Sequence, residues 1–213
     1  MKDLWARLER WANAHGTSLR LRPGAPEAEV AAAEAKLGFA LPPDLRASYL
    51  AHDGQDDADD SFEFLPGCDR LQTLEAVVAR WEEEVDLAAA YAPEDEDACD
   101  EDELIHLALW HPRRVPIAGN PYWDQDNTHC DLFPGPKGTS GQSITLVSEC
   151  DLVVLGPSLE RALSTYLSAL ESGAWIFDAH LNPPRGRVHH KDEPENEWPN
   201  TSYAFSEWVR TRA

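Results

Sequence analysis

Residues 24–55, GAPEAEVAAAEAKLGFALPPDLRASYLAHDGQ, decide the first half of the fold, because they encode two helices joined by a hard turn. Pro26 is tolerated at a first helical position, and the helix dipole favours the two glutamates that follow it. Val30 and Leu37 lie on one apolar stripe at helical spacing. Gly38 comes next, as a left-handed C-terminal cap requires. The first helix is therefore predicted to end at Leu37.

The second helix of this stretch is defined by two prolines. Pro42 and Pro43 stop any helix before them and set the start of the next one. Leu45 and Tyr49 are four residues apart and share one face of that helix. The Asp-Gly dipeptide at 53–54 is a turn signal, so the helix is expected to end there.

The string LGFALPPDLRASYLAHDGQ within this stretch resembles the SUKH superfamily, whose founding members are fungal cell-wall-assembly regulators of the Smi–Knr type. The family pattern is a helix with an internal acidic residue, Leu-Gly, an apolar residue, Leu-Pro, a second helix with a Tyr, and a short Asn/Asp-Gly end. The residues that fill these places are Glu34, Leu37, Gly38, Leu41, Pro42, Leu45, Tyr49 and Gly54.

A second block, residues 110–147, is similar to the other half of the family pattern. Short apolar runs at 115–118, 128–133 and 143–147 are separated by Gly/Pro turns, which is typical of an antiparallel meander. The family has here a Trp, a Pro-Ile strand, an Asp-Leu strand, Pro-Gly-Pro and a closing Gly-Gln. The matching residues are Trp110, Pro116, Ile117, Asp131, Leu132, Pro134, Gly135, Gly141 and Gln142. The resemblance therefore extends over residues 24–170.

The resemblance implies an α+β fold, with a mostly antiparallel sheet of about four to six strands surrounded by helices. We expect one SUKH-like domain over 1–213, with its core at about 24–172. Outside the second block, the patterns predict a helix at 2–15, a half-buried strand at 61–65, a helix over 71–91, a strand at 150–155 and a helix that starts after Pro157. The exposed face of the 71–91 helix is expected to include Glu82, Glu83, Glu84 and Asp86.

The C-terminal extension, residues 174–213, departs from the minimal family pattern. Residues 182–200 are rich in Pro, Gly, His and charge, which predicts a loop or linker. Residues 202–212 are compatible with a short helix. We expect that helix to dock on the domain, because an undocked helix would expose Trp208.

The chain has 39 acidic and 18 basic residues, a formal net charge of −21. This charge argues against nucleic acid or an anionic membrane as a partner, since both are bound through basic patches. It permits a basic protein partner, whose association the field would accelerate. Solubility alone is the competing explanation. The acidic run at 94–103 is expected to be a solvated loop or an interaction surface, and it lacks the spacing of an EF-hand calcium site.

The N-terminus is charged throughout and does not resemble a signal peptide, and no apolar stretch is long enough to span a membrane. We therefore expect a cytoplasmic protein with reduced thiols. The cysteines, none of them at a two-residue spacing, are Cys68, Cys99, Cys130 and Cys150. This spacing makes a zinc knuckle improbable, and no metal or cofactor is expected.

Residues 124–131 are the best candidates for chemistry, because acids, His129 and Cys130 crowd this segment. Adjacent residues of a strand point to opposite faces, so His129 and Cys130 are not expected to share a pocket. Cys130 is then a small buried apolar residue, and Asp131 accepts backbone donors in the following turn. An enzyme using this segment stays the lesser alternative.

The resemblance implies a non-catalytic protein-binding module. Bacterial members look like immunity proteins that neutralise toxins, and fungal members look like interaction hubs in cell-wall signalling. The alanine-rich chain without low-complexity arms favours the immunity reading, with a basic toxin domain as partner; a housekeeping or regulatory scaffold is the alternative. The candidate partner-binding residues are Asp56, Asp57, Asp59, Asp60, Glu82, Glu83, Glu94, Asp95, Glu96, Asp97, Asp124 and Asp126, with Tyr122 and Trp123 as anchors.

Overall fold

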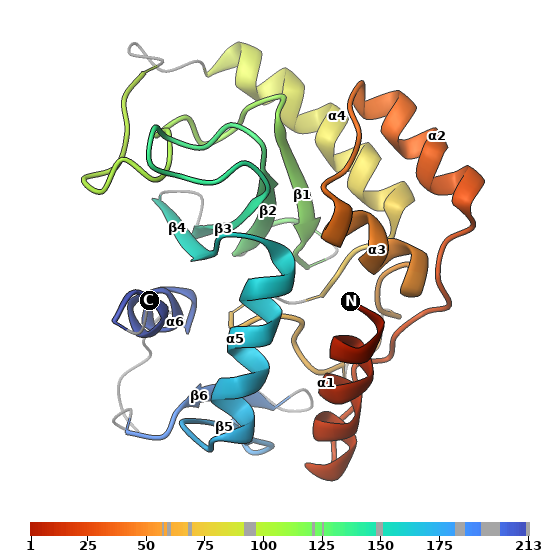
Figure 1. The fold of residues 1–213 in the computed structure, drawn as a ribbon, viewed down its shortest axis with the longest axis vertical. Helices are drawn as coiled ribbons and strands as arrows, with labels where there is room; N and C mark the ends of the chain where they lie inside the picture. The colour runs from red at the N-terminus through yellow and green to blue at the C-terminus, as the bar shows by residue number, and fades with distance from the viewer. Residues whose placement is uncertain are drawn as a thin grey trace.

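The computed structural model describes residues 1–56, 58, 61–67, 70–91, 97–120, 122–124, 126–147, 151–181, 186–192 and 201–211. In these ranges the chain forms six helices and two antiparallel sheets, which confirms the α+β class (Figure 1). The helices are α1 (Lys2–Ala14), α2 (Glu27–Leu37), α3 (Pro43–Ala51), α4 (Leu74–Ala90), α5 (Leu159–Glu171) and α6 (Thr201–Arg210). The strands are β1 (Arg114–Ala118), β2 (Asn127–Asp131), β3 (Gln142–Val147), β4 (Asp151–Gly156), β5 (Trp175–Asp178) and β6 (Arg187–His190).

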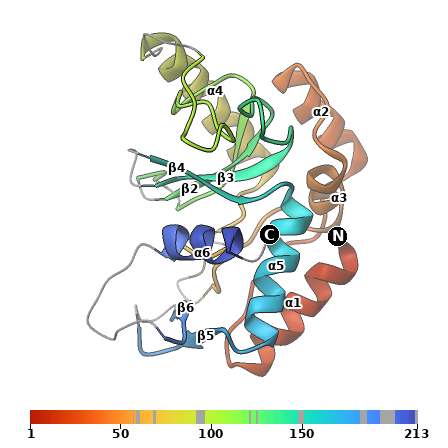
Figure 2. The ribbon, with the colours of Figure 1, turned by 60° about the vertical axis from the view of Figure 1, so that its left-hand side comes forward.

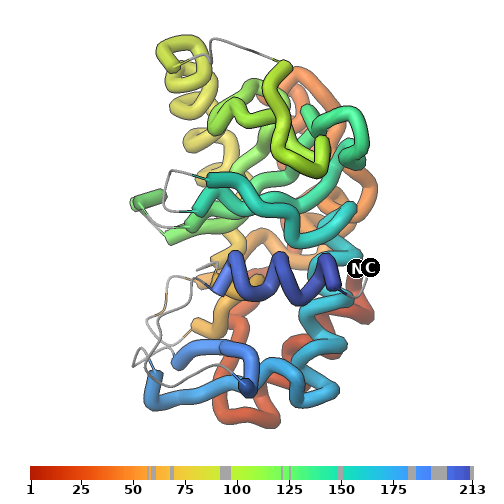
Figure 3. Tube along the Cα trace, turned by 90° about the vertical axis from the view of Figure 1, so that its left-hand side faces the viewer, coloured from red at the N-terminus to blue at the C-terminus, as the bar shows by residue number. Residues whose placement is uncertain are grey.

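The larger sheet is the predicted meander, with strand order β1-β2-β3-β4 and antiparallel neighbours. Figure 3 shows this sheet in the upper half of the molecule and the small β5–β6 hairpin at the opposite end, with α5 running between them. The helical pair α2–α3 lies beside the sheet (Figure 1). The two blocks of the family pattern therefore build one continuous core.

The two faces of the sheet are buried in different ways. One face contributes apolar side chains to the main core between α1, α2, α3 and α5; these are Val115, Ile117, Cys130 and Leu155. The other face meets α4 and the segment 98–112. It combines a small apolar cluster of Ile144, Leu146 and Leu152 with fully or almost fully buried polar residues, namely Arg114, His129, Asp131 and Gln142.

Capping residues set the helix ends, and the end of α2 at Gly38 lies where the sequence predicted it, whereas α4 starts three residues after the predicted start. Gly38 has a left-handed φ of 81°, and its N–H donates to the carbonyl of Glu34. A residue with a Cβ would be strained there. Thr73 caps α4 by accepting from the N–H of Ala76, and Ser158 caps α5 in the same way.

The C-terminal helix docks on the domain, as expected. Figure 2 shows α6 under the larger sheet and beside α5. Phe205 is fully buried and meets the rings of Tyr166 and Trp175 edge-on. The hydroxyl of Ser206 donates to the carbonyl of Val154 at 2.9 Å, which ties α6 to the edge strand β4. The extension is thus part of the core.

Two predictions about the remaining segments are wrong. Residues 61–65 form no strand, and Ser61 makes a single bridge to Ser18. Phe62 and Phe64 are both buried, because Phe62 packs on the rings of Trp11 and Tyr166 and Phe64 packs on the ring of Trp5. The predicted loop at 182–200 contains β6, which pairs with β5. This strand has four residues, too few for a pattern, and Val188 is buried in it through tertiary contacts.

No helix in the described part of the chain is long and apolar enough to cross a membrane.

Candidate functional site

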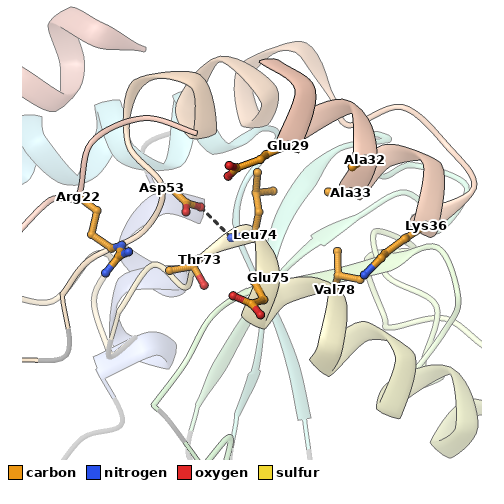
Figure 4. A pocket seen from close by; sticks show the side chains of 10 residues that line it. All are labelled: Arg22, Glu29, Ala32, Ala33, Lys36, Asp53, Thr73, Leu74, Glu75 and Val78. Carbon is orange, nitrogen blue, oxygen red and sulfur yellow. Dashed lines mark hydrogen bonds between the residues drawn. The ribbon is translucent and has the colours of Figure 1, made fainter. Parts of the chain in front are cut away.

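A groove of about 400 Å³ lies between α2 and the first turns of α4 (Figure 4). Its α2 wall is formed by Glu29, Ala32, Ala33 and Lys36, which are spaced i, i+3, i+4 and i+7 and so lie on one helix face. Its α4 wall is formed by Leu74, Glu75 and Val78. The groove therefore has an apolar floor between charged residues.

The segments beside the groove hold the start of α4 in place. The carboxylate of Asp53 accepts from the N–H of Leu74 at 2.8 Å, the bond drawn in Figure 4. Arg22, at the same end, pairs with Asp56 at 3.2 Å. None of the residues that line the groove was a candidate for partner binding in the sequence analysis. The i, i+3, i+4, i+7 spacing on α2 was visible in the sequence, but the opposite wall comes from a distant segment.

The predicted anchors lie on a turn after β1, and the structure places them differently. Tyr122 is 81% exposed, whereas Trp123 is half-buried under the guanidinium of Arg80, whose carbon lies 5.6 Å from the ring centroid. Trp123 adopts a left-handed φ of 55°. The side-chain oxygen of Asn120 accepts from the N–H groups of Tyr122 and Asp124 and fixes the turn. Tyr122 thus remains a candidate anchor.

The acidic candidates do not form one cluster in the described residues. Asp56, Glu82, Glu83, Asp97 and Asp124 are exposed on different elements, and Asp126 is half-buried. The other acids of this set lie outside the described residues; these are Asp57, Asp59, Asp60, Glu94, Asp95 and Glu96. Glu84, which the helical pattern placed on the exposed face of α4, is 2% exposed.

Glu84 is buried because it reaches the polar face of the sheet. Its carboxylate lies 3.0 Å from Nε2 of His129 and 2.9 Å from Nε of Arg80. Burial raises the pKa of Glu84, but the interactions with His129 and Arg80 outweigh burial and leave the pKa below its ordinary value. His129 therefore serves to attach α4 to β2.

Asp131 and Gln142 form a second buried network, which closes the sheet against the segment 98–110. The carboxylate of Asp131 accepts from Nε of Arg114 at 3.2 Å, from the amide of Gln142 at 3.0 Å and from the N–H of Phe133 at 2.9 Å. Arg114 also donates to the carbonyl of His106 at 2.8 Å. The bond from the N–H of Phe133 confirms the predicted turn role of Asp131. Asp131 also forms a buried ion pair with Arg114, which the sequence did not predict.

Other family-motif residues connect the two sequence blocks. Gly141 has a φ of 91°, and a Cβ there would lie 3.3 Å from the ring of Pro42. Tyr49 is fully buried and donates to the carbonyl of Gln72. Among the motif positions of the second block, Pro116 lies in β1, Trp110 contacts the ring of Tyr91, Pro134 bridges Ile105, and Gly135 approaches Glu103. These positions are packing positions.

The segment 124–131 keeps its candidate nucleophile, Cys130, apart from its candidate base, His129. His129 and Cys130 point to opposite faces of β2, as predicted, since His129 meets α4 and Cys130 lies in the main core. Burial raises the pKa of the Cys130 thiol far above its ordinary value, which disfavours the nucleophilic thiolate. No group of three or more potential metal ligands occurs among the residues that the structure describes.

A family model described as SMI1 / KNR4 family (SUKH-1) matches residues 24–165. The chain belongs to this family. The "Cell wall biosynthesis/cell cycle regulator smi1" of Schizosaccharomyces pombe is 29% identical, over 90% of this chain and 42% of that protein. The "Glucan synthesis regulatory protein" of Neurospora crassa is 27% identical, over 84% of this chain and 40% of that protein. The chain thus spans about two-fifths of the length of these relatives.

The expectation of a toxin-immunity protein is wrong. The relatives of this SMI1/KNR4 chain are named as regulators of cell-wall and glucan synthesis, which agrees with the regulatory alternative. The immunity reading rested on alanine content and on the lack of low-complexity arms. Such bulk features report how a chain stays folded and soluble, and they do not distinguish one protein partner from another.

Proposed function

We propose that this protein is a non-catalytic, regulatory protein-interaction module that acts on cell-wall glucan synthesis. The observation that carries the proposal is its likeness to two named regulators over most of its length. Its buried polar residues fit this role, because Glu84, His129, Asp131 and Arg114 are all occupied in holding the domain together. A cytoplasmic location is part of the proposal.

The partner that we propose is a protein with a basic surface. The formal net charge is −21, and exposed acids lie on several elements. Such a field speeds the encounter with a basic partner, and salt screens it beyond about 8–10 Å. Tyr122 supplies an exposed aromatic side chain of the type that often anchors interfaces.

The test is a deletion of the gene in the source organism, followed by measurement of cell-wall glucan. We expect altered glucan content that the intact gene restores. Restoration by Cys130→Ser and Asp124→Ala variants would agree with a non-catalytic role, since neither side chain is needed for chemistry. A loss of more than about a hundredfold in glucan-synthesis activity for a well-folded single variant would favour an enzyme instead. Unchanged glucan after deletion would contradict the regulatory role.

A further inference from the structure

The groove between α2 and α4 has a charge pattern that the fold does not use. Glu29 and Lys36 stand at opposite ends of its α2 wall, with Ala32 and Ala33 between them (Figure 4). Seven residues of helix separate the two charges, which is about 10 Å along the axis. Small side chains in the middle leave room for another backbone to approach.

Three of the five charged side chains of the groove are available for a ligand. Within the part of the chain that the structure describes, Glu29, Glu75 and Lys36 make no ion pair. Figure 4 shows Glu29 on the side of the groove near Asp53, and Lys36 at the far end near Val78. The end near Glu29 also contains Asp53, which accepts from the N–H of Leu74, and Arg22, which pairs with Asp56. Among the described residues, the charge left without an ion pair is therefore acidic at the Glu29 end and basic at the Lys36 end.

We propose that this groove binds an amphipathic helix of a partner protein, with a basic residue at one position and an acidic residue seven positions away. This inference rests on the proposed function, because it names the kind of partner that the module takes. A helix laid along α2 has the same rise per residue, so its charges at i and i+7 meet Glu29 and Lys36 together. Its residues at i+3 and i+4 pack on the exposed Ala32, above the nearly buried floor of Ala33 and Val78, with the spacing of helix-in-groove recognition.

The charges of the groove favour a mixed-charge helix over a second copy of the chain, a nucleic acid or a purely basic helix. A second copy of the chain would bring another net charge of −21 to the surface. A nucleic acid would place phosphates against Glu29 and Glu75. A basic helix without an acidic residue would leave Lys36 unpaired or facing a like charge. The mixed-charge helix complements both ends of the groove.

The probes are two blocked helical peptides of about 18 residues, long enough to hold a helix in water. Both carry Leu at i+3 and i+4 and Arg at i; the mixed peptide has Glu at i+7, and the dibasic peptide has Arg there. We expect the mixed peptide to bind the parent protein at least about threefold more tightly, from one ion pair gained and one repulsion avoided. This order runs against the net charge, which favours the dibasic peptide.

Two variants with the same change of charge test whether the peptide preference depends on the groove. Lys36→Glu is expected to reverse the preference, so that the dibasic peptide binds more tightly. Lys2→Glu, on α1, is the matched control and is expected to keep the parent's preference, since Lys2 is exposed and lies outside the groove. Amide chemical shifts in NMR spectra should change at Ala32, Ala33 and Val78.

The proposal is overturned if the dibasic peptide binds the parent as tightly as the mixed one, or if the preference of Lys36→Glu matches that of Lys2→Glu. It is also overturned if the shift changes lie away from the groove. The glucan measurement is independent of these peptides: altered glucan with failed peptide binding rejects the groove and keeps the regulatory role. Peptide binding with unchanged glucan keeps the groove and rejects the role in the cell wall.

Discussion

Asp131→Ala tests how the second sequence block holds the domain together. The carboxylate and the guanidinium of Arg114 are both fully buried, and Nε lies 3.2 Å from Oδ1. Burial lowers the pKa of Arg114 even though Asp131 raises it, which shows how costly the buried charge is. Removing one partner of such a pair destabilises by about 3–5 kcal/mol, because the other charge is left uncompensated. For a chain of this length we expect the melting temperature to fall by roughly 6–20 °C.

Urea unfolding followed by tryptophan fluorescence measures this loss, and the eight tryptophans supply the signal. The double variant Arg114→Met/Asp131→Leu should be more stable than Asp131→Ala, because it removes both charges. Glu82→Ala removes an exposed carboxylate of α4; it is the control and should stay within about 0.5 kcal/mol of the parent. A loss below about 1 kcal/mol for Asp131→Ala, at an unchanged m-value, would refute the reasoning.

Four further outcomes follow from the same contacts. Gly38→Val should lower the free energy of unfolding by about 1 kcal/mol or more, since its φ is 81°; an unchanged melting temperature would remove the left-handed cap. Glu84 has a lowered pKa, so its stabilisation is present above its unfolded pKa near 4.5 and is lost as the pH falls through the folded value; acid unfolding of Glu84→Gln should lack this component. Phe205→Ala should cost about 3–5 kcal/mol in urea unfolding, and a small loss would contradict docking of α6. Cys130 should resist iodoacetamide in the folded protein, and mass spectrometry showing its rapid alkylation would contradict its burial.

The sequence predicted the parts of the fold that depend on neighbours along the chain. Gly38 and Pro42 act through backbone conformation, so the turn between α2 and α3 is readable from a few residues. The strands of the meander are bounded by Gly/Pro turns, and their observed limits differ from the predicted ones by one or two residues. The same strand alternation separated His129 from Cys130 correctly.

The sequence could not predict features that depend on distant partners. Glu84 follows two exposed glutamates on α4 but lies on the helix face of the buried Val77, and the partner of its carboxylate there, His129, is 45 residues away in the sequence. The strand β6 exists because Trp175 and Val188 are buried together beneath α5 and α6, and its own four residues carry no periodic signal. The predictions made from the local sequence were therefore wrong both for the burial of Glu84 and for the strand β6.

The groove between α2 and α4 also depends on residues that are far apart in the sequence. Its lining differs from the family motif, and this difference bears on how the protein distinguishes partners. The family-motif residues, such as Asp131 and Tyr49, are buried and engaged in packing or hydrogen bonds, so a match to the motif identifies the fold. A partner therefore cannot touch the buried motif residues, such as Asp131 and Tyr49. The groove charges Glu29, Lys36 and Glu75 lie outside the motif, and the fold is complete without them. Discrimination between partners should therefore change with these three side chains while the stability of the domain stays nearly constant.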